Sequence, residues 1–407
     1  MSSIYMVGNT LNRALPFLLL PLLTRWLTTD DYGVIGTFNA VQAQVALAVT
    51  MAVPGAIGRA WLDRGPGGIV FPAYLFNGLI VNLGLFLAVG AIFFVAAGVI
   101  AVKMHLVGVL VWITWVSAFF SAIHAIKAKL WIFQEQPKQF SIYQVTRTAA
   151  NLILSIGLLY YLWMDWRGRI GGIVLVEALT AMVCFYLLFR QDGIHVQFRR
   201  DYLIDILKFS LPMYPHALGM LIITGADKFF LISMEELAVL GVYNVAFAIS
   251  SMILFLAGSI DTSLMPWINR KLKAATPEDN RQIYLVTYGC AAFYVMLALA
   301  LGLVAEPLLS LMVGKAFHGA AEYIMVLSLA HSAGAAYRIF TIPIFYAKKT
   351  GVLAWITMFS GMVTMVADYL LIGRYGAMGA AWGVFVGYAT LCLGAWYYAR
   401  ILDVSGK

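Results

Sequence analysis

Eight charged side chains lie inside long apolar segments of the sequence. They comprise four cations and four acids: Arg13, Arg147, Lys228, Arg338, Glu177, Asp227, Asp261 and Asp368. A charge within a bilayer costs about 2.5–3.5 kcal/mol on insertion scales, so each of them needs a partner, water or a function. Guanidinium binds phosphate through two parallel hydrogen bonds and stays charged. The equal signs leave the substrate's charge open, while several deep arginines favour an anionic substrate.

Polar residues in these segments recur at helical spacing. Asn9 and Arg13 are four positions apart, and the series Gln144, Arg147, Asn151 and Ser155 follows one face of its segment. Spacings of three, four and seven residues place side chains on one side of a helix. Similar series occur in both halves of the chain. We therefore expect these faces to surround a shared, hydrated central cavity that holds the substrate.

Other interpretations remain open for several of these residues. Lys228 could extend to the membrane surface or pair with a neighbouring acid. Arg59 lies at the end of the second segment, where membrane orientation alone would place a cation. Glu177 and Asp368 could bind a coupling ion or pair with buried arginines. The histidines at 216 and 331 are expected to be hydrogen-bonded core residues more often than proton carriers.

The composition predicts an all-α polytopic membrane protein. Hydrophobic residues make up 62% of the 407 residues and charged residues 11%, whereas soluble domains carry about 25% charge. Because about 20 residues cross a hydrocarbon core as a helix, the sequence predicts twelve spans. They are residues 5–27, 33–58, 70–100, 106–130, 139–162, 170–190, 208–231, 238–268, 282–304, 321–346, 351–372 and 377–400.

The loops alternate in charge. Fifteen basic residues occur on one side of the predicted spans and six on the other, so both termini are expected in the cytoplasm. The formal net charge of +8 is then explained by topology, and we predict no nucleic-acid partner. The loops on the other side are short, which leaves no external domain.

The two halves of the chain resemble each other. Residues 31–39 align with residues 236–244, sharing Gly36 with Gly241 and Asn39 with Asn244. The most polar stretch, residues 191–207, lies between the halves. We therefore predict two pseudo-symmetric six-helix bundles, residues 1–195 and 196–407. Transporters with such parallel repeats bind substrate between the bundles.

No enzyme motif is found, so we predict neither catalytic residues nor a metal or other cofactor. Metal-ligand spacings, glycine-rich phosphate loops and nucleophile elbows are missing from the sequence. The pair Asp30-Asp31 is better explained as the first turn of a helix capped by Thr28. Glu235-Glu236 takes the matching position in the second half, a duplication that catalysis would not need.

Three segments carry a family resemblance. They are Leu11 to Gly33 (LNRALPFLLLPLLTRWLTTDDYG), Phe209 to Asn244 with its Asp227-Lys228 pair, and Gly376 to Gly383 (GAMGAAWG). These segments resemble bacterial polysaccharide-unit flippases, the O-antigen and capsule translocases of the multidrug/oligosaccharidyl-lipid/polysaccharide exporter superfamily. The resemblance covers the whole chain in length, number of spans and division into halves.

The resemblance implies two six-helix bundles in a V that alternate access between the leaflets. The implied substrate is undecaprenyl-pyrophosphate-linked oligosaccharide, moved across the bacterial inner membrane, with H⁺ or Na⁺ as possible coupling ion. The family's cationic cavity corresponds to Arg13 and Arg59, and its Asp-Lys pair to Asp227-Lys228. A polysaccharide polymerase and a chain-length regulator are expected partners of a functional monomer. Arg147, Arg338, Asn9, Asn151 and the acids rest on the cavity argument alone.

Two other functions compete with this one. A multidrug or cation antiporter of the same superfamily would confer drug resistance and leave surface polysaccharide unchanged on deletion. A membrane polymerase or glycosyltransferase would carry catalytic charges on a large external loop, and the predicted loops are short.

Overall fold

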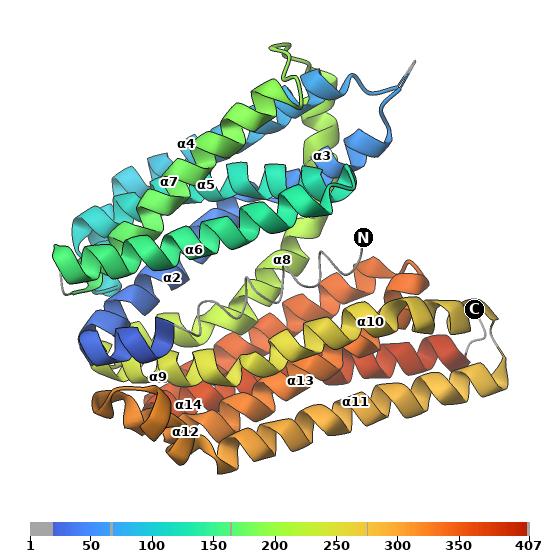
Figure 1. Cartoon of the computed structure of the whole chain (residues 1–407). Coiled ribbons are helices and arrows are strands. Elements are labelled where there is room, and N and C mark those ends of the chain that lie inside the picture. Colours follow the sequence, from blue (N-terminus) through green and yellow to red (C-terminus); the bar gives the residue numbers. More distant parts are fainter. Residues whose placement is uncertain (1–18, 66–67, 163–164, 275, 405–407) are drawn as a thin grey trace. The chain divides into compact units, whose positions relative to one another are not determined.

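The computed structural model describes residues 19–65, 68–162, 165–274 and 276–404. Within these residues the chain is helical, with no β-strand (Figure 1). Residues 19–26 are helical. The elements that follow are α2 Thr29–Thr50, α3 Val53–Leu62, α4 Phe71–Lys103, α5 Gly108–Phe133, α6 Pro137–Tyr161, α7 Trp166–Arg190, α8 Arg200–Met234, α9 Leu237–Ser250, α10 Met252–Ala274, α11 Pro277–Leu303, α12 Ala305–Met312, the 3₁₀ helix η1 Lys315–Ala320, α13 Ala321–Tyr346 and α14 Thr350–Val404.

The predicted all-α polytopic membrane fold is confirmed. Eight helical segments of the described chain are long and apolar enough to cross a bilayer. One of them, α14, is two helices joined at Gly376, whose φ of 58° and ψ of −139° suit glycine alone, so it contains the last two predicted spans. The predicted spans 139–162 and 321–346 form helices α6 and α13. Most of the first predicted span lies outside the described residues.

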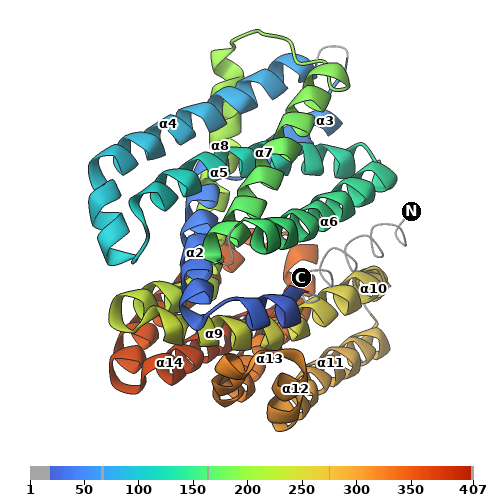
Figure 2. The same ribbon diagram turned by 60° about the vertical axis from the view of Figure 1, so that its left-hand side comes forward.

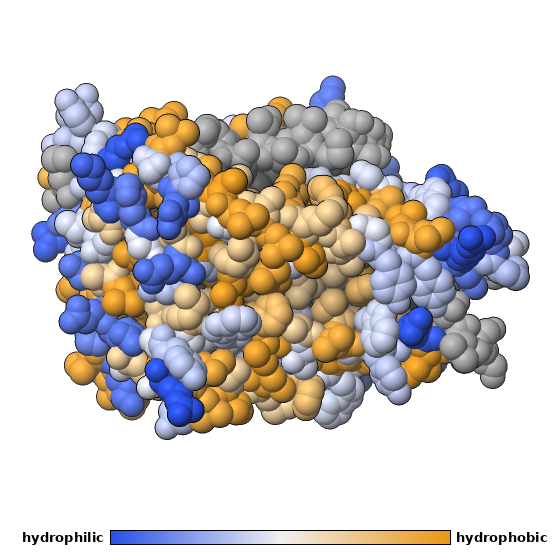
Figure 3. All heavy atoms as spheres, turned by 90° about the horizontal axis from the view of Figure 1, so that it is seen from below, coloured by the Kyte–Doolittle hydropathy of each residue, from blue (hydrophilic) through white to orange (hydrophobic). Residues whose placement is uncertain are grey.

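The surface of these helices is that of a membrane protein. Hydrophobic side chains form a band between hydrophilic ends on the face shown in Figure 3. On α4, Phe94 and Val95 are more than 80% exposed, and on α11 Met296 and Leu303 are also exposed. Apolar side chains at this exposure are stable where hydrocarbon replaces water. Together with the long apolar helices, they make the chain a multi-pass membrane protein.

The second span of each half is broken, where the sequence predicted one continuous segment. Between α2 and α3, Met51 and Ala52 take positive φ values of 38° and 57°, and proline stands in the first turn of α3. Proline begins a helix well because it has no N–H to leave unpaired. In the second half, the chain turns at Ser251 between α9 and α10.

The chain forms two compact units. Among the described residues, the first unit holds Leu19 and Val34–Tyr214, and the second holds Leu20–Gly33 and the chain from Pro215 on. The boundaries between the units fall within helices: between residues 19 and 20, in α2 between residues 33 and 34, and in α8 between residues 214 and 215. In the first unit, α4, α5, α6 and α7 lie side by side (Figures 1 and 2).

The start of α2 packs against α9 within the second unit. A Cβ on Gly33 would overlap the carbonyl of Leu237, and one on Gly241 would overlap the carbonyl of Thr29. Glycine at both positions permits this close helix contact. Thr28 caps α2 as predicted, because its backbone N–H donates to Asp31 (3.0 Å) while its hydroxyl accepts from the Asp31 N–H (3.1 Å). Asp31 therefore has the structural role that the sequence indicated.

The polar stretch between the halves is bound to the first unit. Its second part is helical, because α8 begins at Arg200 and not at the predicted residue 208. Asn77 of α4 donates to the carbonyl of Gln197 (2.8 Å) and accepts from the N–H of Arg199 (3.0 Å). Tyr74 of α4 donates to Asp205 (2.7 Å). These bonds fix the path of the connection along α4.

Candidate functional site

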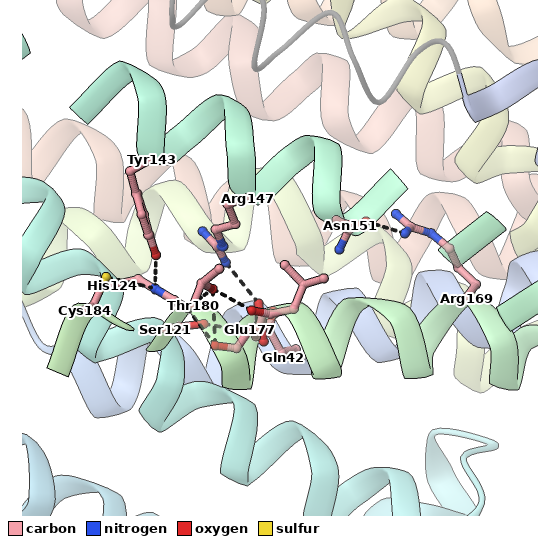
Figure 4. A network of polar contacts seen from close by, with 11 residues as sticks. Gln42, Ser121, His124, Tyr143, Arg147, Asn151, Arg169, Glu177, Thr180 and Cys184 are labelled. Atoms are coloured by element: carbon pink, nitrogen blue, oxygen red, sulfur yellow. Dashed lines mark hydrogen bonds and ion pairs between the residues drawn. The ribbon is translucent and has the colours of Figure 1, made fainter. Parts of the chain in front are cut away.

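A polar network crosses the interior of the first unit, from α2 to α7 (Figure 4). At its centre, Arg147 Nη2 of α6 lies 3.3 Å from Glu177 Oε1 of α7. The Glu177 side chain is 10% exposed and that of Arg147 29% exposed. Gln42 of α2 contacts both Glu177 (3.5 Å) and Ser121 of α5 (3.1 Å). Four helices thus meet around one carboxylate.

His124 extends this network along α5. Its Nε2 lies 3.1 Å from the backbone carbonyl of Glu177, and because a carbonyl only accepts, Nε2 carries a proton. Its Nδ1 hydrogen-bonds the hydroxyl of Tyr143, and Cys184 and Thr180 also contact the ring. The histidine is therefore held in place by hydrogen bonds and helps to position the helix that carries Glu177.

Asn151 lies on the same face of α6, one turn beyond Arg147. It accepts from Arg169 Nη1 of α7 (2.5 Å), which also donates to Ser155 (2.6 Å). Arg169 is one of the six basic residues on the less basic side of the predicted spans. The structure instead places its guanidinium beside Asn151 (Figure 4), so the α6–α7 face carries a second arginine.

In the second unit, Lys228 and Asp227 of α8 form an ion pair. Lys228 Nζ lies 3.2 Å from both carboxylate oxygens of Asp227, and Tyr243 of α9 donates to the same carboxylate (2.7 Å). The Lys228 side chain is 13% exposed and lies 3.5 Å from the centre of the Phe247 ring. Lys228 therefore pairs inside the unit, which was one of the two interpretations of its sequence position.

Asp368 of α14 is buried without a cation partner. Its residue is 0% exposed, and neither carboxylate oxygen has a hydrogen-bond partner among the described residues. It lies within electrostatic range of Asp227 and Lys228, and Gly383 packs so closely that a Cβ there would overlap Asp368 Oδ1. Because an isolated buried carboxylate is costly, this position is suited to a proton or a cation.

A third ion pair joins α10 and α13. Arg338 Nε lies 2.5 Å from Asp261 Oδ2, with the arginine side chain 44% exposed and the aspartate 7% exposed. The second carboxylate oxygen of Asp261 has no partner among the described residues. On α8, His216 hydrogen-bonds Thr357 (3.1 Å), which agrees with a structural role.

Two groups of predicted residues lie elsewhere. Asn9 and Arg13 are outside the described residues. Arg59 lies at the end of α3, where it contacts Asp63 (3.4 Å) and Asp205 (3.5 Å), and about half of its side chain is exposed. Arg59 therefore lies beside the connection between the halves, in the same unit as Arg147.

The guanidinium groups of Arg147 and Arg338 have N–H donors that do not contact their paired acids. Guanidinium has five N–H donors in a planar fork, and each of Arg147 and Arg338 makes one recorded contact with its acid. Both side chains are also partly exposed. Each can therefore bind a further anion while its acid partner offsets the cost of the charge.

The sequence analysis missed the most deeply buried pair of the first unit. Lys127 Nζ of α5 lies 2.6 Å from Asp192 Oδ2, with side chains 0% and 1% exposed. Gln134 donates to the other oxygen of Asp192 (2.7 Å). A signal was present, because Lys127 is three residues beyond His124 and so continues the polar series of its segment.

Comparisons with known proteins agree with this architecture. The sequence pattern of the family described as "polysaccharide biosynthesis protein" matches residues 2–272. The chain belongs to this family. Two Haemophilus influenzae proteins are similar along most of their lengths. One, named "Uncharacterized membrane protein", is 25% identical over 383 residues, covering 90% of this chain and 88% of its own. The other, "Lsg locus putative protein 1", is 21% identical over 376 residues, covering 89% and 88%.

Solved structures share the fold of this chain. The lipid II flippase MurJ, in an inward closed conformation, has a TM-score of 0.77 at 13% identity, covering 98% of this chain and 88% of its own. An inward-facing multidrug resistance MATE family transporter of the MOP superfamily has a TM-score of 0.66 at 14% identity, covering 100% and 95%. The predicted membership of the polysaccharide-unit flippases is confirmed, and the fold is shared with both kinds of transporter.

Proposed function

We propose that the protein flips undecaprenyl-pyrophosphate-linked oligosaccharide units across the bacterial inner membrane by alternating access. The family match, which concerns polysaccharide biosynthesis, supports a glycan-linked substrate. The observation that carries the proposal is Arg147, a guanidinium inside a membrane unit that is paired on one side and partly exposed. Such a group can bind a diphosphate through its exposed side. When no substrate is bound, its charge is still paired with Glu177.

The chemistry favours an anion over a drug-like cation. Arg147 and Arg169 approach one face of α6 and α7 in the first unit, and Arg338 is 44% exposed in the second. Guanidinium matches phosphate geometry and remains charged in any environment. We propose that Arg147, together with Asn151, binds the pyrophosphate in the first unit and that Arg13 and Arg59 assist its entry. Arg338 is proposed as a separate anion-binding position within the second unit. The oligosaccharide follows the pyrophosphate while the polyprenyl chain stays in lipid.

A multidrug or cation antiporter is the second candidate. The unpaired Asp368 is the observation that favours it, because a buried carboxylate can attract a cation, and one structural neighbour is a multidrug resistance transporter. The buried carboxylates of the ion pairs, Glu177, Asp227 and Asp261, are each held by a basic partner, which leaves them less available to a cationic substrate.

A gene deletion distinguishes the two candidates. If the proposal is right, the deletion strain accumulates lipid-linked oligosaccharide on the cytoplasmic leaflet and loses surface polysaccharide, and its drug susceptibility stays unchanged. Unaltered surface polysaccharide together with raised drug susceptibility would instead identify an antiporter.

We further propose that Asp368 is the group that binds the coupling ion, H⁺ or Na⁺. Moving one charge through 100 mV is worth about 2.3 kcal/mol, or roughly 50-fold at equilibrium. In proteoliposomes, an imposed ion gradient should therefore accelerate wild-type transport. The isosteric variant Asp368→Asn should transport at one rate with and without the gradient. An uncharged amide neither takes up a proton nor offers Na⁺ a negative charge.

Asp279→Asn is the matched control for this variant. Asp279 lies at the start of α11, where it pairs with Lys271 at 2.7 Å, so its loss should leave the response to the gradient intact. Persistent stimulation of the Asp368→Asn variant by the gradient would assign coupling to another group.

A further inference from the structure

A cavity lies inside the second unit, among the ends of four helices. Its volume is about 380 Å³, which falls within the range of ligand pockets. It is lined from α10 by Leu272, from the first turns of α11, from the last turns of α13 and from the last turns of α14. These ends come together near the last described residues of α14 (Figure 1). The α6–α7 network described above contributes no residue to it.

The cavity lies near one end of the helices that surround it. Its α11 residues run from Asn280 to Tyr288, which at 1.5 Å per residue lie within about 17 Å of the start of that helix. The end of α10 carries Arg270 and Lys273, and the connection between α13 and α14 carries Lys348 and Lys349. Clusters of lysine and arginine predict the cytoplasmic side of the membrane, so we expect the cavity to open toward the inner leaflet.

Five aromatic side chains line the cavity, namely Tyr284, Tyr288, Phe340, Tyr346 and Trp396. Tyr284 stacks on Tyr288 with ring centres 6.1 Å apart, and Tyr288 packs edge-on against Phe340 at 5.9 Å. Trp396 donates its ring N–H to the Tyr288 hydroxyl (2.7 Å). Tyrosine and tryptophan are typical of the membrane interface, because one end of each ring is apolar and the other is polar. The wall suits an acyl chain below a polar head.

A cation lies at the rim of this wall. The guanidinium of Arg400 lies 5.1 Å from the Trp396 ring centre and is exposed. Among the side chains that the structure describes, no carboxylate forms an ion pair with it. Arginine stacked on an aromatic ring keeps its N–H fork free for a phosphate. The lysines and arginines around the cavity favour a ligand with net negative charge.

We propose that this cavity binds an anionic phospholipid of the cytoplasmic leaflet. The phosphate accepts from Arg400, and an acyl chain lies against Tyr284, Phe340 and Ile339 between α11 and α13. A zwitterionic lipid fits less well because its amine would face the lysines and arginines around the cavity. This site is independent of the transport function proposed above.

Native mass spectrometry of the full chain in detergent tests the site, with phosphatidylglycerol and phosphatidylethanolamine as probes. Arg400→Gln removes the phosphate contact, and we expect about a 10-fold weaker affinity for phosphatidylglycerol, the effect of one charge-assisted hydrogen bond. Ala399→Trp fills the cavity without changing its charge and should weaken binding as much. Arg374→Gln, an exposed arginine earlier in the same helix α14, should bind like the wild type.

The outcomes separate the possible ligands. Preference for phosphatidylglycerol that is lost in Arg400→Gln and Ala399→Trp, with unchanged melting of both lipid-free variants, supports the site. Equal affinity for phosphatidylethanolamine would overturn it. So would phosphatidylglycerol binding that neither variant weakens. Tighter binding of polyprenyl phosphate than of phosphatidylglycerol would also overturn it and assign the cavity to the substrate's lipid.

Discussion

Replacement of Arg147 by glutamine is expected to lower oligosaccharide flipping at least 10-fold. A hydrogen bond to a charged group is worth about 1.5–3 kcal/mol, which corresponds to roughly 10- to 150-fold in binding. Glutamine keeps the length and polarity of the side chain but carries no charge for a pyrophosphate. The measurement is the initial rate of flipping in proteoliposomes that contain equal amounts of folded variant and wild type.

The structure supplies the control for this substitution, because Arg147 also neutralises Glu177 at 3.3 Å. The double variant Arg147→Gln/Glu177→Gln removes the buried carboxylate that the single variant leaves unpaired. If the arginine binds substrate, the double variant stays as slow as the single one. Recovery of flipping in the double variant would show that Arg147 serves only to neutralise Glu177. Arg147→Lys keeps the charge without the planar fork and should retain part of the rate.

The largest expected effect on stability comes from Lys127→Met. The substitution leaves Asp192 buried with its charge uncompensated, since the two side chains are 0% and 1% exposed. Breaking a buried ion pair on one side typically costs about 3–5 kcal/mol. The variant should therefore unfold at a lower temperature in detergent and accumulate less in membranes.

Removing both charges should reverse most of this loss. Lys127→Met/Asp192→Asn leaves an amide that still contacts Gln134, and well-packed neutral replacements of buried pairs are often tolerated. The exposed pair Arg199–Asp201, 2.7 Å apart with side chains 39% and 58% exposed, is the comparison. Arg199→Gln should leave the unfolding temperature close to that of the wild type, because exposed ion pairs contribute little to stability. A single Lys127→Met variant as stable as the double variant would contradict the role of this pair.

The helices and the membrane class could be predicted because both depend on local sequence. Continuous apolar runs predicted the spans, and Thr28 with Asp31 predicted the start of α2 because a helix cap involves residues three apart. The aspartates and arginines inside the spans were also visible, because charge is rare in such segments. These features need no knowledge of which helices pack together.

The partners of the charges could not be predicted. Glu177 meets Arg147, and Asp261 meets Arg338, across helix contacts 30 and 77 residues apart in sequence. Spacing within one helix says nothing about the facing helix, so a paired acid and an unpaired one look alike in sequence. Asp368 became distinct from Asp227 only when the structure placed Lys228 and Tyr243 beside Asp227.

Two further features depend on tertiary packing. Arg169 appeared to be a loop cation because it is close to the start of α7, and only the packing of α6 against α7 brings it to Asn151 and Ser155. The turn at Ser251 has no proline or glycine beside it to mark it. The sequence therefore predicted one continuous segment across it.

The most direct test of the central claim is the orientation of undecaprenyl-pyrophosphate-linked oligosaccharide in proteoliposomes that contain the purified protein. The glycan is placed on one leaflet, and a membrane-impermeant lectin measures its appearance on the other. We predict that the glycan crosses in the presence of the wild-type protein and remains in place in protein-free vesicles. A wild-type protein that leaves the glycan in its original leaflet but drives efflux of a cationic dye would contradict the proposed function.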